Sequence, residues 1–214
     1  GAYPESLMLC ANTLTELFLS GNQITSLTKG IGALVNLKTL YLNGNFITSL
    51  PPEIGLLSNL EKLDISNNGL RSLPPEIGKL TRLEELNLSG SKFVEGLPPE
   101  IGHLDFLVTL HLNACELREL PREIANLDRL LELDVGTNYL TQLPNEIGNL
   151  TRLVTLNLSD NQLTDLPLSM GRCLKLDQCQ LERNPIKNEE LLRKYRIGTD
   201  HLVDYLEKRL FGIN

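Results

Sequence analysis

The sequence has no tryptophan, and aromatic residues make up only 5% of its 214 positions. It lacks any apolar run near the roughly 20 residues that a membrane-spanning helix needs, which argues against membrane insertion. Its histidines, His103, His111 and His201, form no H-x-x-x-H pair and no His/Cys cluster, so no metal or other cofactor is expected. Phosphate-binding and nucleophile motifs such as G-x-x-x-x-G-K-[ST] and G-x-S-x-G are missing too. The sequence therefore does not favour an enzyme.

Basic residues are too few for a nucleic-acid-binding protein. The formal net charge is −7 at pH 7. Proteins that bind nucleic acids need clustered lysine and arginine to displace counterions from phosphates, and anionic membrane surfaces attract the same residues. Hydrophobic residues nevertheless make up 41% of the chain, which is enough for a large core. The composition favours a folded, acidic protein whose partners are not nucleic acids.

A single repeat pattern dominates the chain. It reads L-x-x-L-x-L-x-x-N-x-L-x-x-L-P-x-x-I-x-x-L-x-x. Its first leucines are Leu14, Leu37, Leu60, Leu83, Leu107, Leu130, Leu153 and Leu176. Successive first leucines are 23 residues apart, except that Leu83 and Leu107 are 24 apart. A fixed period of this length predicts a stack of coils that bury their leucines against one another.

The pattern within each repeat predicts one strand and one turn. Leucine alternates with polar residues at its start, as in a short strand whose side chains point to opposite faces. The prolines and the later Ile–Leu pair, such as Ile54 and Leu57, predict a short helical or 3₁₀ turn on the return path. The expected fold is α/β: a curved, right-handed solenoid with a parallel sheet on its concave face and the turns on its convex face.

These repeats resemble the leucine-rich repeat family over residues 14–186, as eight consecutive copies. The resemblance implies a buried ladder of ninth-position asparagines that bind the backbone of adjacent coils. Six of the eight positions carry asparagine, whereas Ser91 and Cys115 depart from the pattern in successive repeats. Smaller groups or bound water must then satisfy the same backbone, and the stack is expected to be softer there. The extra residue of the 24-residue repeat, between Phe93 and Leu97, is expected to bulge out of the loop or to contact a partner.

The two ends of the stack need caps. Residues 1–13 are expected to form an N-terminal cap or the remnant of a preceding repeat. Residues 187–214 are expected to form a C-terminal helical cap, with a turn at "NEELLRKYR" before a helix. That helix would begin after Thr199 or Asp200 and bury one apolar face, formed by Leu202, Val203, Leu206 and Leu210.

The segment "IGTDHLVDYL", residues 197–206, is similar to the C-terminal region of Ras-suppressor proteins. With the "LPxxIGxL" repeats, it resembles the intracellular Ras-interacting group, which includes scribble- and erbin-like proteins and plant relatives. This resemblance implies a scaffold or adaptor in the cytoplasm that binds a small Ras-type GTPase, a phosphatase or an adhesion adaptor.

The four cysteines fit the same interpretation. Extracellular leucine-rich repeat proteins have cysteine-rich caps, and this chain has no such cluster. Cys115, Cys173 and Cys179 replace buried positions of the repeat and are expected to be small apolar core residues. Cys173 and Cys179 lie on opposite sides of a coil, which argues against a disulfide between them. Two alternatives remain open: an extracellular or secreted recognition domain, and a regulatory segment of a larger signalling enzyme.

The third and fifth repeat positions are expected to form contiguous columns on the concave face. Exposed aromatics near the N-terminal end and carboxylates in the middle would contact a partner protein. The candidate residues are Phe18, Tyr41, Phe46, Asp64, Glu85, Asn87, His111, Glu132, Asp134 and Tyr139. A different interpretation of Phe18 and Tyr41 is that they pack under the N-terminal segment or the rest of a longer protein.

Overall fold

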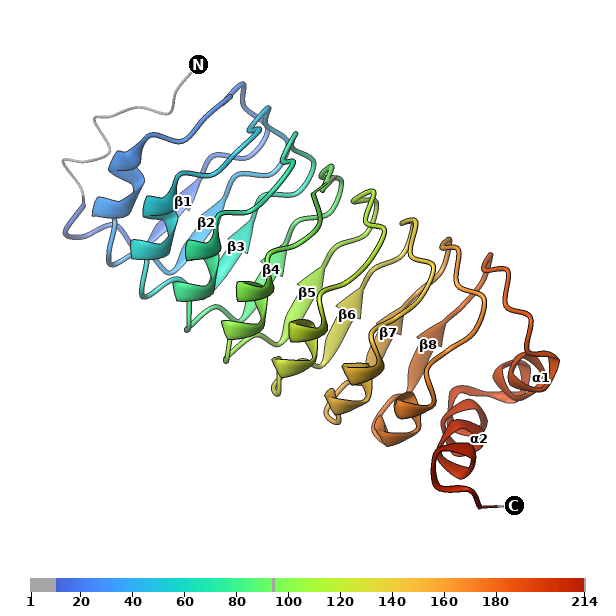
Figure 1. Cartoon of the computed structure of the whole chain (residues 1–214). Helices are drawn as coiled ribbons and strands as arrows, with labels where there is room; N and C mark the ends of the chain where they lie inside the picture. Colours follow the sequence, from blue (N-terminus) through green and yellow to red (C-terminus); the bar gives the residue numbers. More distant parts are fainter. Residues whose placement is uncertain (1–10, 94, 214) are drawn as a thin grey trace.

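The computed structural model describes residues 11–93 and 95–213 as a stack of coils in one continuous arc (Figure 1). Eight parallel strands form one sheet in their sequence order. They are β1 (Glu16–Phe18), β2 (Thr39–Tyr41), β3 (Lys62–Asp64), β4 (Glu85–Asn87), β5 (Thr109–His111), β6 (Glu132–Asp134), β7 (Thr155–Asn157) and β8 (Gln178–Gln180). The expected α/β solenoid is thus confirmed.

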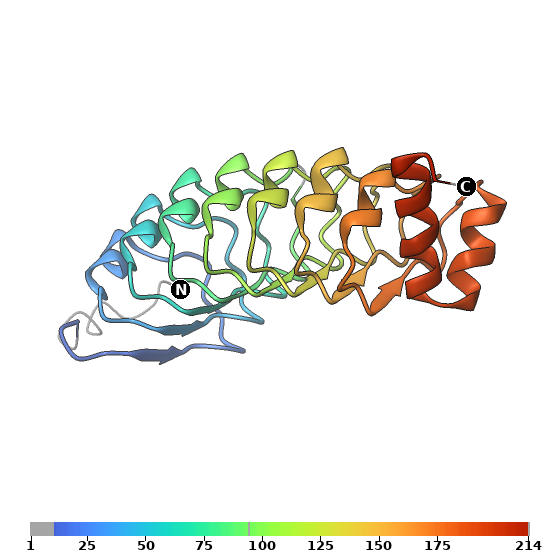
Figure 2. The same ribbon diagram turned by 90° about the horizontal axis from the view of Figure 1, so that it is seen from below.

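Seven 3₁₀ turns connect the strands. They are η2 (Lys29–Ala33), η3 (Pro52–Leu56), η4 (Pro75–Lys79), η5 (Pro99–His103), η6 (Arg122–Asn126), η7 (Asn145–Asn149) and η8 (Leu168–Arg172). Figure 2 shows these turns along the outer side of the arc and the strands along its inner side. Proline begins several of them, as expected: Pro51 is extended before η3, and Pro52 takes the first helical position, where its missing N–H costs least.

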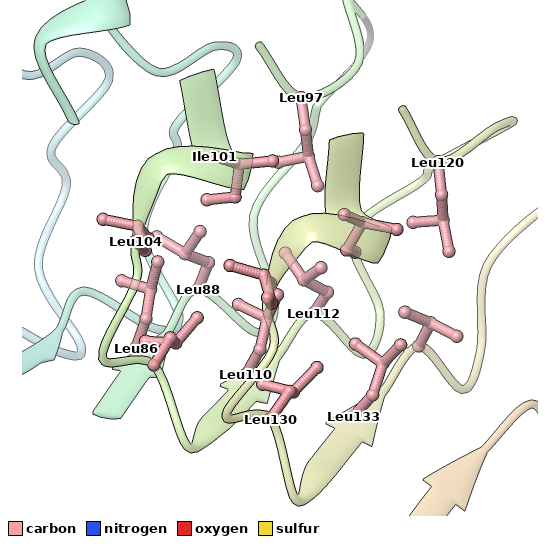
Figure 3. Close-up of a cluster of buried hydrophobic side chains, with 14 of the residues drawn as sticks. Leu86, Leu88, Leu97, Ile101, Leu104, Leu110, Leu112, Leu120, Leu130 and Leu133 are labelled. Carbon is pink, nitrogen blue, oxygen red and sulfur yellow. The ribbon is translucent and has the colours of Figure 1, made fainter. Parts of the chain in front are cut away.

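The core runs through the whole stack between the strands and the turns. Leu86 and Leu88 come from the strand side of one coil, and Ile101 and Leu104 meet them from the turn side (Figure 3). Burying such a side chain contributes about 1.5–3 kcal/mol. Each coil can cover its leucines only with the next coil, so the repeat period is a requirement of the packing.

Glycine stands where neighbouring turns meet. A Cβ added at Gly55 would lie 2.6 Å from the carbonyl oxygen of Glu76 in the next coil, and one at Gly78 would lie 2.7 Å from that of Glu100. Neither distance leaves room for a methyl group. The glycine of the "IG" pair is therefore a packing requirement of the outer side. Ala125, in η6, is the exception and is buried.

The ninth-position asparagines join neighbouring coils. The Asn68 Oδ1 accepts the Ile47 N–H at 2.9 Å, and its Nδ2 donates to the carbonyls of Leu42 and Ile65 at 3.0 Å. The same pattern is repeated by Asn45, Asn138, Asn161 and Asn184. At the first coil Asn22 is exposed and donates to carbonyls of its own coil.

Ser91 and Cys115 interrupt this ladder. Ser91 is 1% exposed, and among the described residues its Oγ has no hydrogen-bond partner. The Cys115 thiol donates to the Leu88 carbonyl at 3.2 Å, and burial raises its pKa to about 11. Asn138 supports this site from the next coil, because its Oδ1 accepts the N–H groups of both Cys115 and Leu117 at 3.0 Å. The predicted local softness stays a prediction.

The 24-residue repeat fits into the stack. Phe93 and Leu97 are both buried in the core, and Val94 lies outside the described residues. Gly96 takes a φ of +78°, a region that favours glycine, and its N–H donates to the Phe93 carbonyl at 3.0 Å. The chain therefore turns between two intact framework positions.

Two helices follow the last strand: α1 (Glu189–Ile197) and α2 (Thr199–Phe211). The prediction of a turn at "NEELLRKYR" is wrong, because those residues form α1, which the Asn188 side chain caps by accepting the Leu191 N–H. The predicted N-cap of α2 is also wrong, since Gly198 takes that place. Leu202, Val203 and Leu206 of α2 are buried, as predicted, and Leu210 is half-buried.

Candidate interaction face

Register in the sheet places the third and fifth repeat positions in two columns. The fifth-position column contains Phe18, Tyr41, Asp64, Asn87, His111 and Asp134, and the third-position column contains Glu85 and Glu132. Parallel strands lie about 4.8 Å apart, so these eight predicted residues share one surface, called the concave face below. Phe46 and Tyr139 are not brought to it. Both are exposed in the loops that follow β2 and β6.

An aromatic pair marks the N-terminal end of the concave face. The rings of Phe18 and Tyr41 meet edge to face, with centroids 5.3 Å apart and planes at 76°. Phe18 is still 59% exposed. At the other predicted aromatic, Tyr139, the Arg118 guanidinium lies 6.0 Å from the ring centroid.

An ion pair and a histidine–carboxylate contact cross from strand to strand in the middle of the concave face. Lys62 Nζ lies 2.6 Å from Glu85 Oε1, and this hydrogen bond raises the pKa of the lysine. His111 Nε2 lies 3.0 Å from Glu132 Oε1. These exposed pairs contribute little stability but fix the side chains in place.

Four fifth-position side chains are also held by their own backbone. Oδ1 of Asp64 accepts the Ser66 N–H at 2.9 Å, and Oδ1 of Asp134 accepts the Gly136 N–H at the same distance. The Oδ1 atoms of Asn87 and Asn157 accept the N–H of the residue two positions later in the same way. Sequence reasoning missed this, although Asp or Asn followed two residues later by Ser or Gly is a usable signal. Each carboxylate keeps its second oxygen for other contacts.

The concave face has a shallow hollow of about 190 Å³ between β2 and β5. Its polar lining consists of Tyr41, Lys62, Asp64, Glu85, Asn87, Thr109 and His111. Over residues 11–93 and 95–213, no group of three His, Cys, Asp or Glu side chains could hold a metal ion. Neither α1 nor α2 is long and apolar enough to cross a bilayer.

Comparison with known families agrees with this architecture. Residues 12–94 match a family described as "Leucine-rich repeat region", and residues 106–163 match one described as "Leucine rich repeat". The chain belongs to the leucine-rich repeat family. No curated protein sequence matches this leucine-rich repeat chain significantly.

Solved structures of other leucine-rich repeat proteins superpose well on the chain. A leucine-rich repeat protein of Leptospira interrogans is 37% identical, with a TM-score of 0.85 over 93% of this chain. The ectodomain of the Arabidopsis thaliana receptor kinase GASSHO1/SCHENGEN3, in complex with Casparian strip integrity factor 2, is 30% identical, with a TM-score of 0.68 over 86%. A TDR receptor is also 30% identical, with a TM-score of 0.77 over 86%.

These proteins are longer than the leucine-rich repeat chain described here. The chain spans 50% of the Leptospira protein, 26% of the GASSHO1/SCHENGEN3 ectodomain and 33% of the TDR receptor.

Proposed function

We propose that this leucine-rich repeat chain is a non-catalytic scaffold that binds a partner protein on its concave face. The observation that carries the proposal is the exposed ring of Phe18, which packs edge to face on the half-buried Tyr41, beside a polar surface that runs along all eight strands. Exposed aromatic side chains are favoured anchors in protein interfaces. The other six strands lie beside this aromatic pair in sequence order, so a bound protein could contact the pair and the polar columns together.

Charge indicates what kind of partner fits. The two columns carry five carboxylates and one lysine: Glu16, Asp64, Glu85, Glu132 and Asp134 against Lys62. Lys62 is already paired with Glu85. A partner segment rich in lysine or arginine would therefore meet carboxylates whose orientation is fixed beforehand, and attraction between the charges would raise its association rate at low salt.

The concave face can be tested by affinity capture and mass spectrometry. Asp64→Arg combined with Asp134→Arg, and Phe18→Ala separately, should each remove the same captured proteins. Glu119→Arg is a matched control, because it reverses an exposed carboxylate outside the two columns. Unchanged capture by the concave-face variants, with circular dichroism showing an intact fold, would rule out this face as the main site.

The proposed partners are a small Ras-type GTPase, a phosphatase or an adhesion adaptor inside the cell. The resemblance of residues 197–206 to the Ras-suppressor group supports this, as do the buried free thiols of Cys115, Cys173 and Cys179. Titration calorimetry with Ras-type GTPases in their GDP and GTP-analogue states is the direct test. Absence of binding in both states would remove the GTPase from the proposal and leave the scaffold role standing.

A second candidate is a recognition domain of an extracellular receptor or secreted protein. The similarity to the ectodomain of the plant receptor kinase GASSHO1/SCHENGEN3 and to a TDR receptor favours it. Cell fractionation with protease protection of the native protein separates the two candidates, because only the second predicts a protein outside the cytoplasm.

A further inference from the structure

A second surface lies along the edge of the sheet formed by the N-terminal ends of its strands. One column, called the entry column, holds the residue just before the first leucine of the second to eighth repeats: Asn36, Asn59, Arg82, Phe106, Arg129, Arg152 and Lys175. Another, called the second column, holds the residue just after each of those leucines: Lys38, Glu61, Glu84, Val108, Leu131, Val154 and Asp177. The two columns share one surface, since Glu61, Arg82, Glu84 and Phe106 line the same hollow of about 400 Å³.

The second column changes character along the stack. In the third and fourth coils it carries Glu61 and Glu84, and in the next three coils it carries Val108, Leu131 and Val154. These three side chains are half-buried, and backbone hydrogen bonds hold them in register. The Leu131 N–H donates to the Val108 carbonyl at 2.9 Å, and the Val154 N–H donates to the Leu131 carbonyl at 2.8 Å. They form a continuous apolar stripe.

The entry column becomes basic beside the same coils. Arg129 lies over the Phe106 ring, with its guanidinium carbon 3.9 Å from the centroid. Arg152 and Lys175 are exposed and, within the described part of the chain, make no hydrogen bond or ion pair. Other cations of this acidic protein differ in this respect: Lys38 pairs with Glu61, whereas Arg71 and Lys79 make no ion pair within the described residues. Arg129, Arg152 and Lys175 together are called the basic flank.

Carboxylates next to the entry column offset its positive charge in some coils and not in others. Asp105 and Asp128 directly precede Phe106 and Arg129 and are exposed. In the next two coils Thr151 and Leu174 take that place, so no carboxylate precedes Arg152 or Lys175. The unpaired charge is therefore concentrated at these two residues.

We propose that the apolar stripe and the basic flank form a docking site for an acidic amphipathic helix of a partner protein, lying along the stack. An α-helix repeats every 5.4 Å, close to the coil spacing of about 4.8 Å, so apolar residues at i, i+4 and i+7 would meet Val108, Leu131 and Val154 in turn. Side chains on one face of an extended strand recur about every 6.8 Å and would lose this register. Carboxylates on one flank of the helix reach Arg152 and Lys175.

The ends of the site follow from the same columns. Glu84 would repel an acidic helix on one side, and Asp177 ends the stripe on the other. The contacting positions from i to i+7 span about two turns of the helix, and so short a contact supports a transient interaction rather than a permanent one. This edge is separate from the two columns of the concave face, so either site can fail without the other.

A designed peptide tests the site. The probe is a fluorescein-labelled helical peptide of about 14 residues, with leucine at i, i+4 and i+7 and glutamate on the flanks. Its binding is measured by fluorescence anisotropy at low and physiological salt. Two control peptides carry a central proline, which breaks the helix, or lysine in place of every glutamate.

The acidic helical peptide is expected to bind, and both control peptides to bind at least about tenfold more weakly. Arg152→Glu combined with Lys175→Glu should weaken binding by at least about tenfold. A control with the same charge change, Arg71→Glu combined with Lys79→Glu, should leave binding unchanged. So should Asp134→Arg, which alters the concave face.

Several results would overturn the proposal. These are equal binding of the proline peptide, equal binding of the lysine peptide, or no effect of reversing Arg152 and Lys175 in a folded protein. Phosphatidylserine vesicles provide a further arm. If the protein bound those vesicles through Arg152 and Lys175 and left the acidic peptide unbound, the edge would be a membrane contact instead.

Discussion

Replacing Asn138 with alanine should lower the free energy of unfolding by about 3–5 kcal/mol. Asn138 is 5% exposed, and its amide accepts two backbone N–H groups and donates to three backbone carbonyls. Each buried donor left without a partner costs about 1–3 kcal/mol. Carbonyls have a second lone pair and lose less, so the two N–H groups of Cys115 and Leu117 account for most of the estimate.

Urea unfolding measures this difference. The chain has no tryptophan, so tyrosine fluorescence and far-ultraviolet circular dichroism are the two probes, and coincident transitions would support a two-state treatment. The matched control is Asn22→Ala, at the exposed end of the ladder, which should cost less than about 1 kcal/mol. If the two variants lost the same stability, the asparagine ladder would not be what holds the coils together.

Other substitutions test other parts of the stack. Ser91→Asn should stabilise the protein by about 1 kcal/mol in urea unfolding, because it restores an amide where a buried hydroxyl has no partner among the described residues; a loss would mean that the coil has no room for the amide. Gly55→Ala should destabilise it by about 1–3 kcal/mol, since the methyl group meets the Glu76 carbonyl; an unchanged unfolding midpoint would contradict this. Tyr195→Phe should cost about 1 kcal/mol at pH 7, because its hydroxyl donates to Glu182 at 2.6 Å. That hydrogen bond lowers the pKa of Glu182, so its contribution is present above the unfolded pKa and is lost as pH falls through the folded one. The hydroxyl also accepts the Leu181 N–H at 3.1 Å, a contribution that does not titrate, so a total cost that did not fall at all on acidification would argue against the assignment.

The period of the leucines is enough to predict the strands, their order and the face each side chain takes. Each coil buries the same positions, so a residue such as Leu86 can be placed from its spacing alone. Helix α1 could not be found in this way, because only Leu191 of its nine residues is buried. Its signals are local: Asn188 as the cap, acidic residues in its first turn and basic residues in its last.

The candidate site was only partly predictable for a related reason. Repeat position determines that Asp64 and Asp134 point away from the core, and the strand pairing confirms that they share a column. It does not determine which rotamer a long side chain adopts, so the pairing of Lys62 with Glu85 had to come from the structure. Exposure alone carries no information about direction, so the sequence does not separate the loop aromatics Phe46 and Tyr139 from the residues of the column.

The glycine contacts between the turns determine the shape of the whole arc. Sheet hydrogen bonds fix the separation of the coils on the inner side, and the contact of glycine with the next backbone fixes it on the outer side. The radius of the arc is thus the outcome of two local distances. Ala125 adds one methyl group on the outer side, where the facing Glu146 is exposed and its counterparts, such as Glu123, are half-buried. A methyl group added at one of these glycines would push neighbouring turns apart on the outer side and increase the curvature, and replacing Ala125 with glycine would decrease it. The width of partner that the concave face fits would then change although none of the residues on that face had changed.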